Sequence, residues 1–360
     1  MRLSVLPALL SLMMLSAPAT AIANTQDDTV RIAQTDALMG DYQGQVPGAA
    51  LLILREGEPA IARHYGLADV SAGTAVSGRT NFRLASVSKQ FTAMAILVLQ
   101  AEGKLSIDDR LAHWLPGLPP ATTTVTLRHL LDHSSGLIDY EDVMPDGLER
   151  QLRDADVLEI LKGQDRTYFT PGNGYRYSNS AYALLALIVE KASGLSYPDF
   201  LRQRLFLPLG MAGTHARTDD GPAIAHRAYG HSLIDGRWQR TDQSLTSAVL
   251  GDGGIYSSTD DLARWLAAMA SGQGLPAGVT IQASTPSNTV HGETDVSHYG
   301  MGLRLGPGIL WHSGESIGFR NVMIRFPEAK MAIVLLSNRN DPEPYALARK
   351  IAALWGAPSP

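Results

Sequence analysis

The chain has 360 residues, of which 45% are hydrophobic and 18% charged, with ten histidines, no cysteine and a formal charge of -5 at pH 7. This composition is typical of a globular protein and excludes a disordered, collagen-like or disulfide-stapled chain. Basic residues number 30 against 35 acidic ones, so nothing indicates a nucleic-acid partner. Six of the basic residues are lysines, at positions 89, 104, 162, 191, 330 and 350. Chemistry that needs an amine therefore has few candidates.

The first residues are typical of a secretory signal peptide. Arg2 precedes an apolar run over residues 3–15 that is too short to span a bilayer, and small residues follow it. The triplet that ends at Ala23 fits a signal-peptidase site, with the triplet that ends at Ala21 as an alternative. We therefore expect residues 1–23 to be a cleaved signal peptide and the protein to be periplasmic or secreted, without a stable membrane anchor. A buried N-terminal helix is the alternative interpretation.

The first part of the chain predicts a hairpin and then a helix. Residues 48–69 contain two apolar runs that are separated by the polar sequence Arg-Glu-Gly-Glu at 55–58. From Ser86 to about Glu102 the apolar residues recur at helical spacing, and Gly103 ends that pattern.

The remainder of the chain predicts helices and then strands. Residues 111–269 are expected to be mainly helical, and their clearest helix, over 180–192, is followed by a C-cap at Gly194. We predict strands at 299–305, 319–326 and 331–336 and a last amphipathic helix at 345–355. Strands at both ends of the chain indicate one sheet built from the two termini, with an all-helical insertion. The predicted domains are an α/β domain made of 24–110 and 290–360 and a mainly helical domain over 111–289.

Ser86 and Lys89 are the first candidates for chemistry. They lie where strand-like sequence changes to helical sequence, and side chains at positions i and i+3 of a helix share a face. A serine hydroxyl is a poor nucleophile until a base removes its proton, which a neutral amine can do. The helix N-terminus also favours the anionic form of the serine. The spacing alone is weakly specific, and a capping serine beside a solvated lysine is an equal alternative.

Two further motifs offer groups for the same kind of chemistry. Tyr177 and Asn179 stand between a glycine-rich loop and the clearest helix. A tyrosine beside an ammonium group can act as a general base, and an asparagine can both donate and accept. His312, Ser313 and Gly314 enter a C-terminal strand, where a free backbone N–H group can bind a developing oxyanion. Taken singly, a tyrosine used for packing and a histidine with a local hydrogen bond are the alternatives.

In this order and with these separations, the three motifs resemble the S-x-x-K, Y-x-N and K-T-G (or H-x-G) motifs of the serine hydrolases related to class C β-lactamases. That family includes D-alanyl-D-alanine carboxypeptidases, D-amino-acid-specific peptidases and amidases, and family VIII-type esterases. The resemblance covers most of residues 45–355 and includes H-S-S-G at 133–136 and the segments 169–211 and 251–266. It implies a β-lactamase/transpeptidase-like α/β fold, with a central antiparallel sheet flanked by helices beside an all-α domain and the site between them.

The resemblance also implies roles for residues of the first two motifs. Ser86 would be the acylated nucleophile, and Lys89 would be its partner in proton transfer. Tyr177 would be the general base and would protonate the leaving group. Asn179 would orient Lys89 and bind the substrate through a hydrogen bond. No cofactor or metal is implied.

The third motif would bind substrate and complete the oxyanion hole. His312 would take the place of the family's lysine, followed by Ser313 and Gly314 on the same strand. The backbone N–H groups of Ser86 and Glu315 would bind the oxyanion; removing one such donor usually costs about 10²- to 10³-fold in rate. Arg320, further along the strand region, would hold an acidic substrate group or be an exposed strand residue.

Two other patterns are set aside. Residues 314–318 match G-x-S-x-G, but that nucleophile elbow needs a following helix and a later histidine, whereas a strand is expected here and His312 is the last histidine. A cluster of acidic residues and one histidine fits no zinc or calcium spacing, namely Asp132, His133, Asp139, Glu141 and Asp142.

His312 distinguishes between possible substrates. A lysine there would offer a permanent cation to the carboxylate of a penicillin or cephalosporin, whereas a histidine is mostly neutral at pH 7. We therefore expect hydrolysis of a small ester or of an amide or peptide bond, including bonds to D-amino acids of cell-wall origin, through an acyl-enzyme on Ser86. The alternatives are a weak β-lactamase or penicillin-binding DD-carboxypeptidase and, in another class, a non-catalytic periplasmic protein that binds cell-wall fragments.

Overall fold

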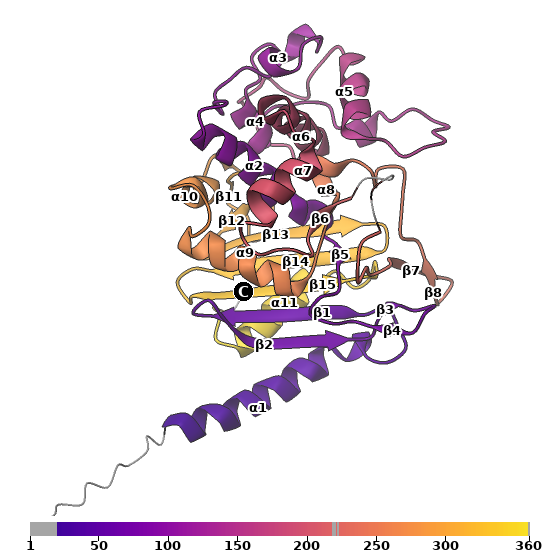
Figure 1. Cartoon of the computed structure of the whole chain (residues 1–360), viewed down its shortest axis with the longest axis vertical. Helices are drawn as coiled ribbons and strands as arrows, with labels where there is room; N and C mark the ends of the chain where they lie inside the picture. Colours follow the sequence, from indigo (N-terminus) through magenta and orange to yellow (C-terminus); the bar gives the residue numbers. More distant parts are fainter. Residues whose placement is uncertain (1–19, 218–220, 222, 359–360) are drawn as a thin grey trace, which may run out of the picture.

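The structure is a computed structural model that describes residues 20–217, 221 and 223–358 (Figure 1). Residues 1–19 of the predicted signal peptide lie outside the described residues, so cleavage near Ala23 stays a prediction. The first described element is helix α1 (Thr20–Leu38). Among the described residues, no helix has both the length and the apolar character that a membrane crossing requires.

An eight-stranded antiparallel sheet forms the centre of the described fold (Figure 1). Its strand order is β10-β11-β12-β13-β14-β15-β1-β2, so β1 from the N-terminal part pairs with β15 from the C-terminal part. The strands are β1 (Ala49–Arg55), β2 (Glu58–Tyr65), β10 (Asn288–Thr289), β11 (His298–Tyr299), β12 (Arg304–Gly306), β13 (Ile309–Ser316), β14 (Phe319–Phe326) and β15 (Met331–Ser337). The predicted sheet from both ends of the chain is confirmed.

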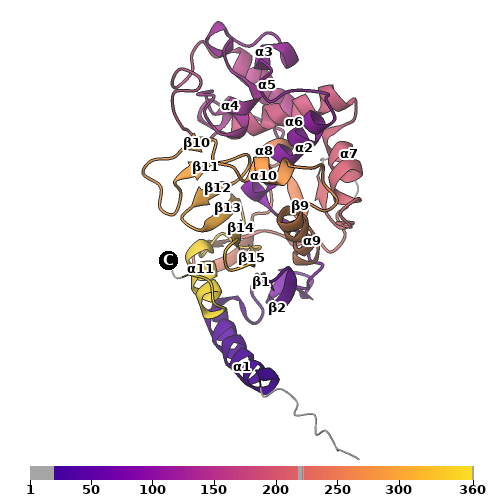
Figure 2. The same ribbon diagram turned by 90° about the vertical axis from the view of Figure 1, so that its left-hand side faces the viewer.

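Apart from Arg55 and Ser337 at their ends, strands β1 and β15 are apolar, because helices cover both faces of the sheet. Successive side chains of a strand point to opposite faces. Leu52 of β1 packs in the cluster that contains residues of α9 (Thr259–Ser271), whereas its neighbour Leu51 packs in the cluster that contains residues of α11 (Tyr345–Leu354). Figure 2 shows these two helices on opposite sides of the sheet. Burying each such leucine contributes roughly 1.5–3 kcal/mol.

The remaining helices gather mainly at one end of the molecule, above the sheet in Figure 1. At their centre, α6 contacts α2, α4, α5, α7 and α8. The bounds are α2 (Lys89–Ala101), α3 (Leu111–Trp114), α4 (Leu127–Leu131), α5 (Asp154–Lys162), α6 (Asn179–Ser193), α7 (Tyr197–Leu201), α8 (Leu250–Gly253) and α10 (Val279–Ala283). Short strands elsewhere form small sheets, β3 (Leu67–Asp69) with β4 (Thr74–Ala75), β5 (Phe82–Arg83) and β6 (His215–Ala216) with β9 (Ile255–Ser257), and β7 (His231–Ile234) with β8 (Arg237–Arg240).

Helix α6 lies where the sequence predicted a helix and is one residue longer at each end. The hydroxyl of Ser178 accepts the N–H of Ala181 at 3.1 Å and so caps the first turn. Gly194 follows the last turn with a φ of 74°, a left-handed conformation that glycine adopts without steric cost.

The predicted strand over 299–305 is wrong, because this segment is the hairpin of β11 and β12. Gly302 lies in its turn with a φ of 77°, which a continuous strand cannot contain. A Cβ atom at this glycine would lie 2.7 Å from the backbone oxygen of Lys89, so the turn packs directly on the start of α2.

Two helices pack against a different part of the molecule from the domain in which their residues were predicted to lie. Helix α9 falls within residues 111–289, yet it contacts β1 and β15 of the sheet. Helix α2 falls within residues 24–110, yet it contacts α6 at the centre of the helical part. The predicted insertion is also not all-helical, because β6, β7, β8 and β9 lie within 111–289, as does β10 of the central sheet. The division into domains stays a prediction.

Candidate active site

A cavity of about 300 Å³ lies where the sheet meets the helical part of the molecule. Ser86, Asn179, Asp252 and Glu315 line it, and they come from the turn before α2, from α6, from α8 and from β13. Four segments that are far apart in the sequence thus meet at one cavity.

Ser86 lies in a short 3₁₀-helix, Ala85–Ser88, between strand β5 and helix α2. The preceding residue, Ala85, has a φ of 49°, a left-handed conformation that is uncommon for a residue with a Cβ atom. Such backbone strain is often found at functional sites, where the surrounding structure maintains it.

Lys89 joins three of the segments around the cavity. Its side chain is fully buried, and its Nζ atom donates to the Oγ of Ser86 at 3.1 Å, to the Oδ1 of Asn179 at 2.8 Å and to the backbone oxygen of Asp252 at 2.8 Å. An ammonium group has three hydrogens, and each one has an acceptor here. The predicted proximity of Ser86 and Lys89 and the predicted contact of Asn179 with Lys89 are both present.

A hydrogen bond from its backbone N–H group holds Asn179 in position. It is the first residue of α6, and its N–H donates to the Oδ2 of Asp139 at 2.7 Å. This bond and the cap by Ser178 fix the start of the helix, so the amide oxygen of Asn179 points at the ammonium group of Lys89.

Tyr177 lies beside the cavity without lining it. The Nζ of Lys89 is 4.8 Å from the centre of its ring, and the Cζ of Arg304 is 5.4 Å from the same point. The phenol oxygen of Tyr177 is buried and has no hydrogen-bond partner among the described residues, so no other group of the described protein occupies it. Its role as general base stays a prediction.

His312 is buried and does not line the cavity, and its two ring nitrogens bond within the protein. Nδ1 lies 2.6 Å from the backbone oxygen of Ser313, and Nε2 lies 3.0 Å from the hydroxyl of Tyr299. A carbonyl oxygen can only accept, so Nδ1 carries the proton and Nε2 accepts from the tyrosine. Burial, together with Arg304 and Lys89, lowers the pKa of His312 well below its usual value. The ring is therefore neutral at pH 7, and its contact with a substrate stays a prediction.

Gly314 allows β13 to approach the turn that carries Ser86. A Cβ atom at this position would lie 2.0 Å from the backbone oxygen of Leu84, closer than packed atoms can come. Because of this approach, Ser86 and Glu315 line the same cavity. The structure thus brings together the two residues whose N–H groups are predicted to bind an oxyanion.

Arg320 and Ser316 also line the cavity. Arg320 forms an ion pair with the carboxylate of Glu315 at 2.5 Å, and its side chain is mostly buried, so it is not an exposed strand residue. Ser316 ends β13 opposite Phe319 of β14. A strand therefore follows it, as predicted, and the G-x-S-x-G sequence is the end of a hairpin.

No sequence pattern predicted the part that α8 plays in the site. Asp252 supplies its backbone oxygen to Lys89, and its carboxylate accepts the hydroxyl of Tyr140 at 3.0 Å. Burial raises the pKa of this carboxyl group to about 8. The segment 251–266 was noted for its resemblance to the family, but nothing in it predicted this contact, because Lys89 lies 163 residues earlier.

The acidic cluster near residue 139 supports the site. Asp139 accepts the N–H groups of Glu141 and Asn179. The Nδ1 of His133 accepts the N–H of Ser178 at 3.1 Å, which fixes the chain just before α6. Glu141 lines the cavity. Burial is the main cause that raises the pKa of Glu141, and the neighbouring Asp139 raises it further.

Comparisons with known proteins agree with this geometry. The family model described as Beta-lactamase matches residues 26–355. Penicillin-binding protein 4* of Bacillus subtilis (strain 168) is 34% identical over 332 residues, which are 85% of this chain and 72% of that protein. An octameric penicillin-binding protein homologue from Pyrococcus abyssi has a similar structure, with a TM-score of 0.79 and 26% identity over 93% of this chain and 78% of that one.

A D-amino acid amidase from Ochrobactrum anthropi SV3, complexed with L-phenylalanine amide, is also similar. Its TM-score is 0.74 and its identity 25%, over 89% of this chain and 95% of that one. The fold is therefore β-lactamase/transpeptidase-like, as the resemblance implied. The chain belongs to the Beta-lactamase family of serine hydrolases.

Proposed function

We propose that this protein is a secreted hydrolase that cleaves small esters or amide and peptide bonds, including bonds to D-amino acids, through an acyl-enzyme on Ser86. The observation that carries the proposal is the 3.1 Å contact between the Nζ of the buried Lys89 and the Oγ of Ser86. An ammonium group in this position favours negative charge on the serine oxygen, and thus its attack on a carbonyl carbon.

The reaction would proceed in two steps. The Oγ of Ser86 attacks the substrate carbonyl while Tyr177 accepts the hydroxyl proton. The N–H groups of Ser86 and Glu315 bind the oxyanion, and the leaving group departs with the proton from Tyr177. A water molecule then attacks the acyl-enzyme and gives its proton to Tyr177, which returns it to the Oγ of Ser86 as the acid leaves. Lys89 lies between the two groups, because its Nζ donates to the Oγ of Ser86 and is 4.8 Å from the centre of the Tyr177 ring.

The cavity favours a small substrate with polar groups. Its volume of about 300 Å³ lies at the lower end of the usual range for small-molecule sites. The carboxyl group of Glu141 lines it together with two cations, Arg83, which donates to the backbone oxygen of Ser247, and Arg320, which is paired with Glu315. Because His312 is neutral, no free cation on β13 offers itself to the carboxylate of a β-lactam. We therefore propose amide or ester cleavage in preference to β-lactam hydrolysis.

Turnover of p-nitrophenyl acyl esters and D-aminoacyl anilides tests the proposal. The wild type should hydrolyse at least one of them, and Ser86→Ala should lose at least about 10⁴-fold in kcat. Ser316→Ala is the matched control, because Ser316 is another serine that lines the same cavity, and it should keep kcat within a few fold. Equal activity of the wild type and Ser86→Ala would refute Ser86 as the nucleophile.

Two outcomes would favour the alternatives. Rapid hydrolysis of nitrocefin would make a β-lactamase or penicillin-binding DD-carboxypeptidase the better assignment. This is the first alternative because two similar proteins are named penicillin-binding proteins. Reversible binding of peptidoglycan fragments in calorimetry, with no turnover of any substrate, would favour the non-catalytic binder.

Secretion is tested separately. Expression of the full chain in a Gram-negative host should give a periplasmic protein whose N-terminal sequence begins at Asn24. A cytoplasmic product that retains Met1 would contradict this part of the proposal.

A further inference from the structure

The turn that joins β13 to β14 borders the catalytic cavity and follows one of the two predicted oxyanion donors. Ser316 and Phe319 are the last paired residues of the two strands, and Ile317 and Gly318 lie between them. Glu315, whose backbone N–H is predicted to bind the oxyanion, directly precedes this turn. The position of that N–H group therefore depends on how firmly the turn is held.

The register of the hairpin points the N–H of Glu315 away from β14. A two-residue hairpin closes on a pair of residues whose N–H and C=O groups face each other, and the groups of the next pair point outward. The closing pair here is Ser316 and Phe319, and the next pair is Glu315 and Arg320. On the outward side, β12 pairs with β13 only over residues 309–311 among the described residues. The N–H of Glu315 thus faces an open strand edge.

Arg320 holds this turn with both terminal nitrogens of its guanidinium group. Nη1 donates to the backbone oxygen of Ser316 at 3.2 Å and to that of Phe319 at 3.1 Å, and Nη2 pairs with the carboxylate of Glu315 at 2.5 Å. The side chain is mostly buried and lines the cavity. Because hydrogen bonds from a cation are stronger than neutral ones, this one group ties the end of β13 to the start of β14.

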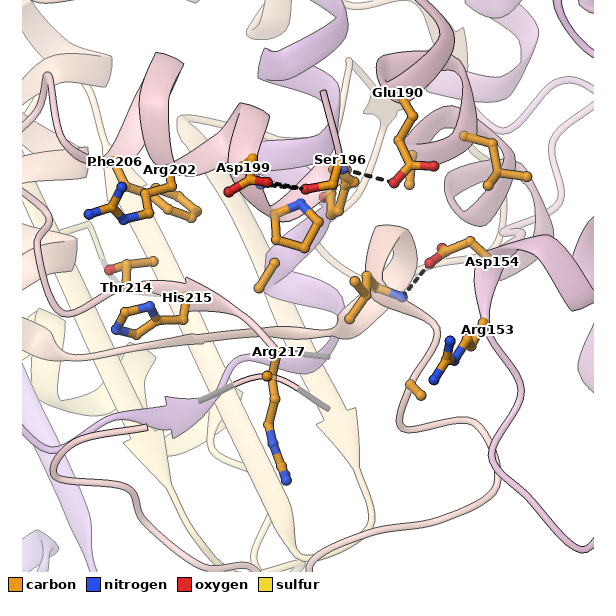
Figure 3. Close-up of a pocket in the computed structure, with 18 of the residues that line it drawn as sticks. Arg153, Asp154, Glu190, Ser196, Asp199, Arg202, Phe206, Thr214, His215 and Arg217 are labelled. Atoms are coloured by element: carbon orange, nitrogen blue, oxygen red, sulfur yellow. Dashed lines mark hydrogen bonds between the residues drawn. The ribbon is translucent and has the colours of Figure 1, made fainter. Parts of the chain in front are cut away.

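The Ser86 side of the oxyanion hole is held by other groups. Asp154 accepts the N–H of Leu250 at 3.0 Å at the start of α8, and Figure 3 shows this bond in the wall of a larger cavity of about 550 Å³. The backbone oxygen of Asp252 in the same helix accepts from Lys89, which also donates to Ser86. A change in the turn between β13 and β14 should therefore move one oxyanion donor and leave the other in place.

We propose that Arg320 is a positioning residue for the reaction, because it holds the turn between β13 and β14 so that the N–H of Glu315 stays aimed at the oxyanion. This inference rests on the proposed function, in which Ser86 attacks a carbonyl carbon and the oxyanion forms beside it. A misplaced donor loses most of its effect, since a displacement of about 1 Å can cost about 10²-fold in rate.

Binding of an acidic substrate group is the other role open to Arg320. Both terminal nitrogens of its guanidinium group already bond to acceptors of the turn. A substrate carboxylate would have to displace Glu315 from its ion pair before it could bind there. The contacts therefore favour the positioning role.

Steady-state kinetics with an oxygen substrate and its sulfur analogue test the proposal. The probes are the compound that the wild type cleaves fastest among p-nitrophenyl acyl esters and D-aminoacyl anilides, and its thiono analogue, in which sulfur replaces the carbonyl oxygen. Sulfur is a weaker hydrogen-bond acceptor, so the N–H of Glu315 assists the thiono analogue less. Arg320→Gln should lose about 10²-fold in kcat on the oxygen substrate with little change in KM, and its ratio of oxygen to sulfur rates should fall about 10-fold. A variant that merely contained less folded protein would keep the wild-type ratio.

Arg325→Gln is the matched control. Arg325 lies on the same strand, donates to the backbone oxygen of Met269 at 3.2 Å and does not line the cavity, so this variant should keep both kcat and the ratio. A wild-type ratio in Arg320→Gln would overturn the proposal. A loss confined to p-nitrophenyl hydrogen glutarate, an ester with a carboxylate in its acyl chain, would assign Arg320 to substrate binding and overturn it as well. A wild type that cleaves none of these compounds would instead refute the proposed function.

Discussion

At the scale of single residues, Lys89 connects the parts of the catalytic centre. Its contact with Ser86 could be predicted, because two residues three positions apart at the start of a helix share a face. Its contacts with Asn179 and with the backbone of Asp252 span 90 and 163 residues. The first of these followed only from the family resemblance, and the second was not predicted, because local sequence does not determine which distant carbonyl a buried amine will meet.

Gly314 gives a prediction at this scale. Gly314→Ala should push β13 away from the turn that carries Ser86, because the new Cβ atom would lie 2.0 Å from the backbone oxygen of Leu84. We expect the free energy of unfolding to fall by about 1–3 kcal/mol and the rate of substrate turnover to fall by at least about 10²-fold.

The matched control is Gly40→Ala, because a Cβ atom there meets nothing within 4 Å. Chemical denaturation and steady-state kinetics on both variants are the measurement. Normal turnover by Gly314→Ala would show that the position of Glu315 relative to Ser86 does not matter for catalysis.

At the scale of elements, the start of α6 positions two of the predicted catalytic groups. Tyr177 and Asn179 flank Ser178, which caps the helix. The bounds of α6 could be predicted closely because a cap, an apolar pattern and a terminal glycine agree. The hairpin of β11 and β12 could not be predicted, because its turn at Gly302 is set by packing on the backbone of Lys89, which local sequence does not reveal.

The cap of α6 gives the second prediction. Ser178→Ala removes the acceptor of the Ala181 N–H and should cost about 1 kcal/mol in the free energy of unfolding. Because the first turn of α6 also orients Asn179, we expect kcat to fall about 10-fold.

Ser258→Ala is the control, since Ser258 caps α9 in the same way by accepting the N–H of Asp261 at 3.3 Å. It should lose similar stability and keep its kcat. Urea denaturation and kinetics measure both quantities. A kcat in Ser178→Ala equal to that of Ser258→Ala would mean that the start of α6 has no special role in catalysis.

At the scale of the whole molecule, the sheet joins the two ends of the chain through β1 and β15. This arrangement could be predicted from apolar strand patterns at both ends and a helical pattern between them. The division into two domains could not be predicted to the same degree. The amphipathic helix α9 covers the sheet and α2 packs among the helices, and a helical pattern does not state which surface its apolar face will meet.

The buried titratable groups determine how stability depends on pH. Burial raises the pKa of Asp252 to about 8 and that of Asp154 to about 7, above about 3.9 for an unfolded aspartate. The folded state then binds more protons than the unfolded state, so stability from these groups is full below about pH 4 and is lost as the pH rises toward 8. Burial lowers the pKa values of His133 and His312, so stability from these groups is lost as the pH falls below about 6.5.

The third prediction follows from these opposite signs. The contribution of the aspartates to the free energy of unfolding should fall as the pH rises from 6.5 to 8, while the opposite pH dependence of the histidines fades as the pH rises above their unfolded pKa of about 6.5. Asp252→Asn should reduce that slope by up to about 1 kcal/mol per pH unit, because the amide cannot ionise. Asp165→Asn, at an exposed position, should leave the slope unchanged. Urea denaturation at several pH values measures the slope, and an unchanged slope in Asp252→Asn would contradict a protonated Asp252 in the folded protein.

The most direct test of the account is intact mass spectrometry after reaction with a phosphonate ester, a probe that bonds covalently to the nucleophilic serine of serine hydrolases. We predict that the wild type and Ser316→Ala each gain the mass of one phosphonyl group, that peptide mapping places it on Ser86, and that Ser86→Ala gains none. An adduct on another residue, or an equal adduct on Ser86→Ala, would contradict the assignment of Ser86 as the nucleophile.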